Sequence, residues 1–67
     1  MTWEELRGNW RLLQAKVQQQ WGKPSNADMD FVQGRRDQLA ERLRERYGFS
    51  REQADKEILH WYERLNA

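Results

Sequence analysis

Four tryptophans, Trp3, Trp10, Trp21 and Trp61, stand out in a chain of only 67 residues that contains no cysteine. A domain of about 60 residues buries only about 60% of the surface of its unfolded chain, so it depends on large apolar side chains. Each buried aromatic side chain removes about 150–250 Å² from water. In an otherwise very hydrophilic sequence, the tryptophans therefore predict one compact domain that spans residues 1–67.

The composition excludes several classes of protein but does not indicate a particular function. Without cysteine, the chain has neither disulfides nor thiolate metal ligands. Its first residues lack the basic and apolar segments of a signal peptide, and no apolar run approaches the ~18 residues of a membrane span. The 12 basic and 11 acidic side chains give a net charge of +1, which provides little attraction to polyanions. We therefore expect a cytoplasmic protein that does not bind membranes.

The first third of the chain carries the pattern of an amphipathic helix. Thr2 with Glu5 three residues later is a capping-box sequence, which marks a helix start. Gly22 and Pro24 are typical of a helix end. The pattern predicts one continuous helix over residues 3–21. Its apolar residues recur at spacings of three and four, on one side of a helix: Trp3, Leu6, Trp10, Leu13, Val17 and Trp21.

Three shorter helices are expected in the rest of the chain. Ser25 or Asn26 can cap the second helix, and Gly34 is expected to break the chain before the third. Gly48 fits the left-handed position that closes the third helix, and Ser50 can cap the fourth. No segment alternates apolar and polar residues with period two, the pattern of a strand. The sequence therefore predicts an all-α fold of about four short helices.

The apolar stripes of these helices predict the core, which we expect to consist of Trp10, Leu13, Val17, Val32, Leu39, Leu43, Tyr47, Ile58 and Trp61. A second apolar face lies on the far side of the first helix, at Gly8, Leu12 and Ala15. Because its residues are small or apolar, another helix could pack closely on this face, either from the same chain or from a second copy. We expect packing within the chain, because a small protein needs every apolar face for its core. We accordingly expect a monomer, or at most a weak dimer at micromolar concentration.

The titratable side chains form no recognisable catalytic or metal-binding motif. His60 is the only histidine, and it is expected to project away from the apolar stripe of its helix. Asp28 and Asp30 diverge on a helix, and we expect both to be solvated. We predict no enzyme activity, no catalytic, cofactor-binding or metal-binding residue, and no cofactor. One acidic ladder at i, i+4 spacing is also expected to be solvated and to hold a divalent cation only weakly: Asp37, Glu41 and Glu45.

The sharpest candidate for binding is basic. Arg35, Arg42 and Arg46 fall on one side of the third helix and form a stripe that can follow phosphate groups. Interleaved carboxylates weaken its field, and arginine stems often cover the edge of a small core. Two interpretations stay open: a weak nucleic-acid-binding face, and, favoured over it, a solvated face that packs against the core.

A series of short segments runs in order along almost the whole chain: Gly8-Asn9-Trp10, Lys16-Val17, Trp21-Gly22-Lys23, Asp28-Met29, Gly34, Arg36-Asp37-Gln38-Leu39, Glu45-Arg46-Tyr47-Gly48, Gln53-Ala54, Lys56-Glu57 and Trp61. No single segment is diagnostic, but the ordered set resembles the CsbD-like family of small bacterial general stress-response proteins, particularly its YjbJ-type members. The chain departs from the family pattern at Ala15 and Ala40, where the family usually has glycine, and at the turn Pro24-Ser25-Asn26-Ala27.

The resemblance implies an all-α domain of about four helices, arranged as two helical hairpins packed roughly at right angles, similar to the SAM-domain-like architecture. It also implies an abundant cytoplasmic protein made under general stress, but it supplies no activity. Together with the absence of a catalytic site, it favours a non-enzymatic protein that acts through its surface as an interaction module, with a partner that the sequence does not name. The family offers no catalytic residues to carry over, and likeness of fold alone is a weak guide to function.

Overall fold

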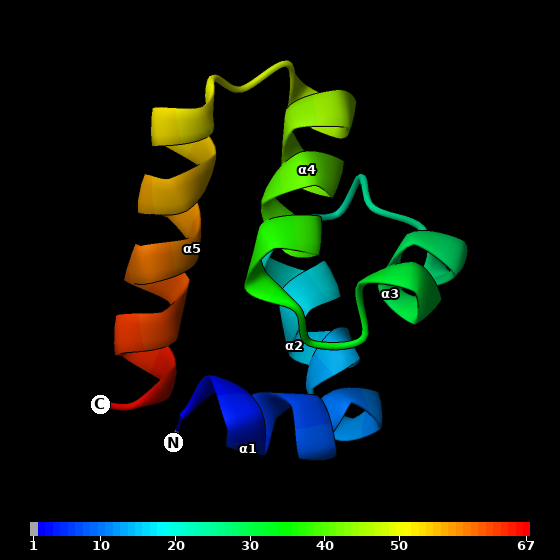
Figure 1. Ribbon diagram of the computed structural model, residues 1–67, viewed down its shortest axis with the longest axis vertical. Helices are drawn as coiled ribbons and strands as arrows, with labels where there is room; N and C mark the ends of the chain where they lie inside the picture. Colours follow the sequence, from blue (N-terminus) through cyan, green and yellow to red (C-terminus); the bar gives the residue numbers. More distant parts are fainter. Residues whose placement is uncertain (1) are drawn as a thin grey trace.

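The computed structural model describes residues 2–67, which form five α-helices and no β-strand (Figure 1). The helices are α1 (Trp3–Gly8), α2 (Trp10–Gln20), α3 (Asn26–Val32), α4 (Arg36–Tyr47) and α5 (Arg51–Leu65). In Figure 1, α4 and α5 lie side by side as an antiparallel hairpin, and α1 crosses below them near the last turn of α5. The predicted all-α class is confirmed. None of the helices in the described part of the chain has the length and apolar character that crossing a membrane requires.

Local sequence signals set the ends of these helices. Thr2 Oγ1 accepts a hydrogen bond from the Glu5 backbone N–H at 3.3 Å, and Ser50 Oγ accepts one from the Gln53 N–H at 3.1 Å. Each hydroxyl satisfies an N–H that the first turn of a helix leaves without a partner. Gly48 ends α4 with a φ of 71°, in the left-handed region that favours glycine. These predicted caps are confirmed.

The predicted continuous helix over residues 3–21 is wrong, because the chain turns at Asn9. This residue has a φ of −114° and a ψ of 24°, outside the helical region, and separates α1 from α2. Its backbone N–H and its side-chain amide each donate to the Glu5 carbonyl oxygen at 3.0 Å. Gly8 and Asn9 are weak helix formers, and an asparagine that binds the backbone competes with helical hydrogen bonds. Both short helices still turn their apolar residues towards the core.

The core draws side chains from all five helices. Every residue of the predicted core is buried except Tyr47, which is half-buried. Tyr47 stays at the edge because its ring stacks on Phe49, with centroids 5.0 Å apart, and its hydroxyl accepts from the Lys23 backbone N–H at 3.2 Å. Five further apolar residues are buried in addition to the predicted ones: Leu6, Trp21, Met29, Ala40 and Ala54.

An aromatic cluster joins the two ends of the fold. The Trp61 ring on α5 lies 5.8 Å from the Trp21 ring and 6.3 Å from the Trp3 ring, measured between centroids. Trp3 also stacks on Tyr62 at 5.2 Å, with the two rings only 7° from parallel. Trp21 Nε1 donates to Glu57 Oε1 at 3.3 Å, so this indole is both buried and hydrogen-bonded. The cluster therefore fastens α1 and the end of α2 to α5.

The second apolar face is not used within the chain. Gly8, Leu12 and Ala15 are all exposed, and Leu12 keeps 76% of its surface. The expectation that this face packs within the chain is wrong, because no other helix lies against that side of α2. Two other large apolar side chains are also exposed, Phe31 by 49% and Leu59 by 45%.

The loop between α3 and α4 carries a close backbone contact. Gly34 has a φ of +77°, and a Cβ added there would lie 2.7 Å from the Arg7 Cα on α1. Gln33, the residue before it, is also left-handed, with a φ of 48°. The predicted break at Gly34 is confirmed. The close approach of Gly34 to Arg7 on α1 is a tertiary contact, which the sequence pattern does not predict.

Candidate interaction surfaces

Asp28, in the first turn of α3, is the one charged residue that residues 2–67 bury, with 5% exposure. Its carboxylate accepts from the Ser25 backbone N–H at 3.0 Å, while Ser25 Oγ accepts from the Asp28 N–H at 3.2 Å. This reciprocal capping box fixes the start of α3. It also holds the carboxylate in the position where α4 can reach it.

Arg46 on α4 binds this carboxylate with two parallel hydrogen bonds. Its Nε donates to Asp28 Oδ2 at 2.9 Å, and its Nη2 donates to Oδ1 at 3.1 Å. Bidentate, charge-assisted pairs of this kind are the stronger hydrogen bonds in proteins. The bonds from Arg46, followed by the bond from the Ser25 backbone, lower the pKa of Asp28 from 3.8 to about 2, although burial opposes them. The hydrogen bonds to Asp28 likewise raise the pKa of Arg46.

Arg42 adds a second contact between α4 and α3. Its guanidinium lies 4.3 Å from the Phe31 ring centroid, in cation–π geometry, and its Nη1 donates to Glu45 Oε2 at 3.0 Å. Its Nε is 3.8 Å from Asp28 Oδ1, which suits an ion pair but is too long for a hydrogen bond. That Nε is the buried side-chain polar atom in the described residues that lacks a hydrogen-bond partner. Arg46 is therefore the principal partner of Asp28.

Arg35 holds the other end of α3. Its Nη2 donates to the Phe31 carbonyl oxygen at 3.0 Å, and its Nε donates to the Val32 carbonyl oxygen at 3.3 Å. The last carbonyl groups of a helix have no partner within the helix, and arginine is a common way to satisfy them. Arg35 thus fixes the C-terminal end of α3, as Ser25 and Asp28 fix its start.

The predicted arginine stripe therefore exists as one face, and that face contacts α3. Arg35, Arg42 and Arg46 all reach α3, and two of them share the negative charge of Asp28. The expectation that Asp28 is solvated is wrong, because the capping box and Arg46 enclose it between two helices. One signal for this was present in the sequence, since Asp28 stands three residues after a capping serine and beside the buried Met29.

The other titratable candidates lie at the surface, as expected. His60 is exposed, and so is each carboxylate of the acidic ladder on α4: Asp37, Glu41 and Glu45. Glu41 accepts from Arg44 Nη1 at 3.3 Å, one turn along the helix. Within residues 2–67, no group of three or more histidine, aspartate or glutamate side chains is arranged to hold a metal ion.

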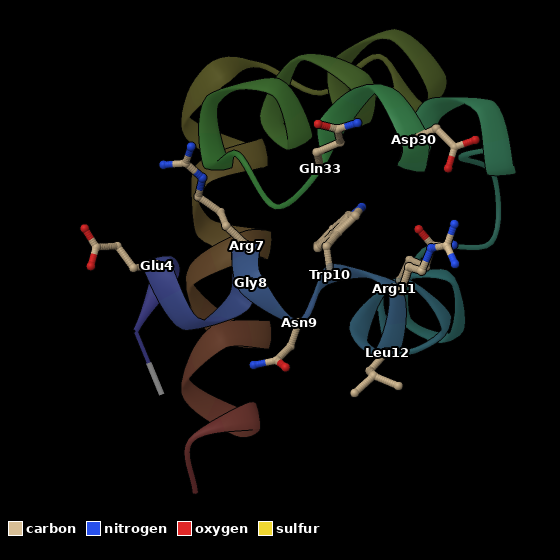
Figure 2. A pocket seen from close by; sticks show the side chains of 10 residues that line it. Glu4, Arg7, Gly8, Asn9, Trp10, Arg11, Leu12, Asp30 and Gln33 are labelled. Atoms are coloured by element: carbon tan, nitrogen blue, oxygen red, sulfur yellow. The ribbon is translucent and has the colours of Figure 1, made fainter.

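A broad groove of about 760 Å³ opens beside α1 and the first turn of α2 (Figure 2). Trp10 lines it, and its Nε1 donates to the Met29 carbonyl oxygen at 2.7 Å across to α3. Small-molecule pockets are typically enclosed and mainly apolar, whereas this groove is open and carries both signs of charge. Figure 2 shows its charged side chains, two on each side of Trp10: Glu4, Arg7, Arg11 and Asp30.

The Asp28–Arg46 pair predicts a specific acid sensitivity. A carboxyl whose folded pKa lies below its unfolded value stabilises the fold above the unfolded pKa of 3.8 and loses that effect as the pH falls towards about 2. We expect Asp28→Asn to lower the free energy of unfolding by about 2 kcal/mol at pH 5, since one pKa unit corresponds to about 1.4 kcal/mol. The difference between parent and variant should shrink as the pH falls through this range.

Urea unfolding of both proteins between pH 5 and pH 2 measures this difference. Glu41→Gln is the matched control, because Glu41 is an exposed carboxylate in a surface ion pair, worth about 0–1 kcal/mol. A constant difference between parent and Asp28→Asn at every pH would contradict the assignment of Asp28 as the titrating group.

The fold and these surfaces define the class of protein as a small all-α domain whose buried charge serves helix packing. Three curated relatives match nearly all of the chain. The UPF0337 protein YjbJ of Escherichia coli (strain K12) is 44% identical over 61 residues, covering 91% of this chain and 88% of the relative. The protein of the same name from Salmonella typhimurium is 42% identical over 66 residues, with 98% and 94% coverage. A UPF0337 protein of Rhodopseudomonas palustris is 40% identical over 65 residues, with 97% and 98% coverage.

The chain belongs to the UPF0337 family. The predicted likeness to YjbJ-type proteins is thereby confirmed. No family model matches the chain. The names of these relatives state no molecular activity.

Proposed function

We propose that this chain is a non-enzymatic, CsbD-like stress-response protein of the bacterial cytoplasm that acts by binding another protein through its surface. The exposure of Leu12 carries this proposal. An apolar side chain keeps 76% of its surface in contact with water, in a chain of which 34% of the residues are charged. The relatives are bacterial, and the resemblance of the ordered segments to the CsbD-like family supports the biological setting. The buried carboxylate is held by Ser25 and Arg46 and serves packing.

A competition between bacteria with and without the gene tests this function. We expect the fraction of the strain without the gene to fall under osmotic stress and in stationary phase, and to stay constant without stress. A gene encoding Leu12→Glu should fail to restore fitness. Ala27→Glu places the same charge at an exposed apolar residue of α3 and should restore it. Equal fitness in every condition, with no rise of the transcript under stress, contradicts the proposal.

Weak nucleic-acid binding through Arg35, Arg42 and Arg46 is the second candidate function. The observation in its favour is that the three guanidinium groups gather along α3 and that the Arg46 side chain is still 44% exposed. The charge of Asp28 works against it, because this carboxylate already occupies two donors of Arg46. Any affinity for phosphate is therefore expected to be low.

Salt dependence separates the two functions. Binding through phosphate contacts must weaken steeply between about 50 mM and about 200 mM salt. Fluorescence anisotropy of labelled single-stranded and duplex DNA measures it, with Arg35, Arg42 and Arg46 replaced together by glutamine. Arg44→Gln on α4 is the control, and circular dichroism verifies that each variant folds. Absence of binding at low salt, or equal binding by the triple variant, rules this function out.

A further inference from the structure

The outer face of α2 is basic and carries an exposed leucine. Leu12 and Lys16 are four residues apart and lie on the same side of the helix, with Gln19 one turn further. All three side chains are exposed, Leu12 by 76%. The charged residues of α2 are Arg11 and Lys16, and the helix has no acidic residue. We call Leu12, Lys16 and Gln19 the α2 face.

The outer face of α5 is acidic and also carries an exposed leucine. Leu59 is 45% exposed, and Asp55 and Glu63 stand four residues before and after it, on the same side of the helix. Glu52 lies one further turn back on this side, with Lys56 at its edge. The ion pairs of residues 2–67 involve the carboxylates of Asp28, Glu41 and Glu45, so the exposed Glu52 and Glu63 take part in none of them. Asp55 is half-buried and borders a hollow with Arg36 and Arg51. We call Glu52, Asp55, Leu59 and Glu63 the α5 face.

We propose that copies of this chain associate head to tail, with the α5 face of one copy on the α2 face of the next. Each face offers one leucine to cover the other, and their charges are opposite. Two α2 faces would bring Lys16 against Lys16, and two α5 faces would bring carboxylates together, so a symmetric pair is disfavoured. A contact between two different faces is heterologous and propagates as an open chain unless the rotation closes a ring.

The arrangement of the helices suits this mode of assembly. Figure 1 shows α5 along one edge of the molecule. Lys16 and Gln19 of α2 border a hollow with Trp61, Arg64 and Leu65 of α5, whereas Leu59 lies on the other side of α5 from Trp61. Leu12 borders the groove, and in Figure 2 its side chain points away from Trp10. A copy that docks through α5 therefore keeps its own α2 face available for another.

The small size of the two faces sets the strength of the contact. Stable interfaces bury about 1,200–2,000 Å² in total, which faces built around single leucines do not reach. The contact is therefore short-lived, and the chain is monomeric at micromolar concentration and associates as the concentration approaches the millimolar range. The exposed charges make this association sensitive to salt, because the Debye length falls from about 10 Å at 0.1 M to about 3 Å at 1 M.

Sedimentation velocity of the purified chain, from about 10 μM to about 1 mM, tests the inference. At low salt we expect the weight-average mass to rise at least twofold across this range. At about 0.5 M salt the mass should remain that of the monomer. A parent chain that stays monomeric at about 1 mM in low salt overturns the inference. It leaves the fitness test of the proposed function unaffected, because a different protein partner does not require self-association.

Two variants define which faces meet. Leu12→Glu blocks the α2 face and Leu59→Lys blocks the α5 face, so each variant alone should be monomeric. Mixed in equal amounts, they should form a heterodimer that grows no further, because each contributes its one intact face. Ala27→Glu, which places the same charge at an exposed residue of α3, is the control and should associate like the parent. Self-association of Leu59→Lys alone, or failure of the mixture to dimerise, overturns the head-to-tail arrangement.

Discussion

Replacing Trp61 with alanine is expected to lower the free energy of unfolding by about 3–5 kcal/mol, which is comparable to the whole stability of a domain of this size. Trp61 is 5% exposed and lies against the rings of Trp3 and Trp21. Its removal leaves a cavity at the point where α1 and the end of α2 meet α5. Since the chain cannot collapse around so large a void, Trp61→Ala should be largely unfolded at room temperature.

Trp10→Ala should have an effect of similar size for a second reason. The Trp10 indole is 7% exposed, and its Nε1–H is hydrogen-bonded to the Met29 carbonyl oxygen. The variant loses the packing of the ring and also this hydrogen bond, which adds about 0.5–1.5 kcal/mol, while the Met29 carbonyl keeps the Gln33 backbone N–H as a donor. The two tryptophans thus stabilise the fold in different places, Trp61 on α5 and Trp10 against α3.

Thermal melting followed by circular dichroism measures both effects. Leu12→Ala is the control, because Leu12 is 76% exposed and its truncation should change stability by no more than about 0.5 kcal/mol. Cooperative melting of Trp61→Ala and Trp10→Ala near the temperature of the parent would remove these residues from the core.

The helix ends were predictable because their signals are local. Thr2 and Ser50 each accept a hydrogen bond from an N–H three residues later, and Gly48 adopts the left-handed conformation that its position indicated. Such contacts depend on a few consecutive residues, so the sequence contains all the information that determines them. The core was predictable for a related reason, since the apolar spacing of each helix identifies its inward side.

The break at Asn9 was not predictable from the same pattern. The apolar residues continue through it at helical spacing, so the stripe reads as one helix although the backbone turns. The exposure of Leu12 depends on this turn and on the absence of a helix against that side of α2. Periodicity identifies which residues share a side of a helix, and it does not identify which of two apolar sides will find a partner.

The sequence predicted that the three arginines share one side of a helix, but it did not predict which residue they bind. Helical geometry correctly placed Arg35, Arg42 and Arg46 on one side, but their partner Asp28 lies 18 residues before Arg46 in the sequence. A contact over that distance depends on how α3 docks on α4, which no local pattern specifies. The candidate binding face is therefore also the contact that holds α3, and a test of binding must separate these two roles.

Replacing Gly34 with alanine is expected to lower the free energy of unfolding by about 2–4 kcal/mol, for two additive reasons. Its φ of +77° lies in the left-handed region, where a residue with a Cβ costs about 1–2 kcal/mol. The added Cβ would also lie 2.7 Å from the Arg7 Cα and 3.1 Å from the Arg7 backbone nitrogen. Because these are main-chain atoms, α1 has to move away from the loop, and the aromatic contacts of Trp3 move with it.

Gly48→Ala separates the two causes. Gly48 has a nearly identical φ of +71°, but a Cβ there would meet no atom within 4 Å. This variant should show only the conformational cost, about 1–2 kcal/mol. Arg7→Ala should not rescue Gly34→Ala, because the closest contact is with the main chain, which truncation leaves in place. Urea unfolding of the four proteins measures these differences. Equal stability of Gly34→Ala and Gly48→Ala would show that α1 does not pack on the loop between α3 and α4 in solution.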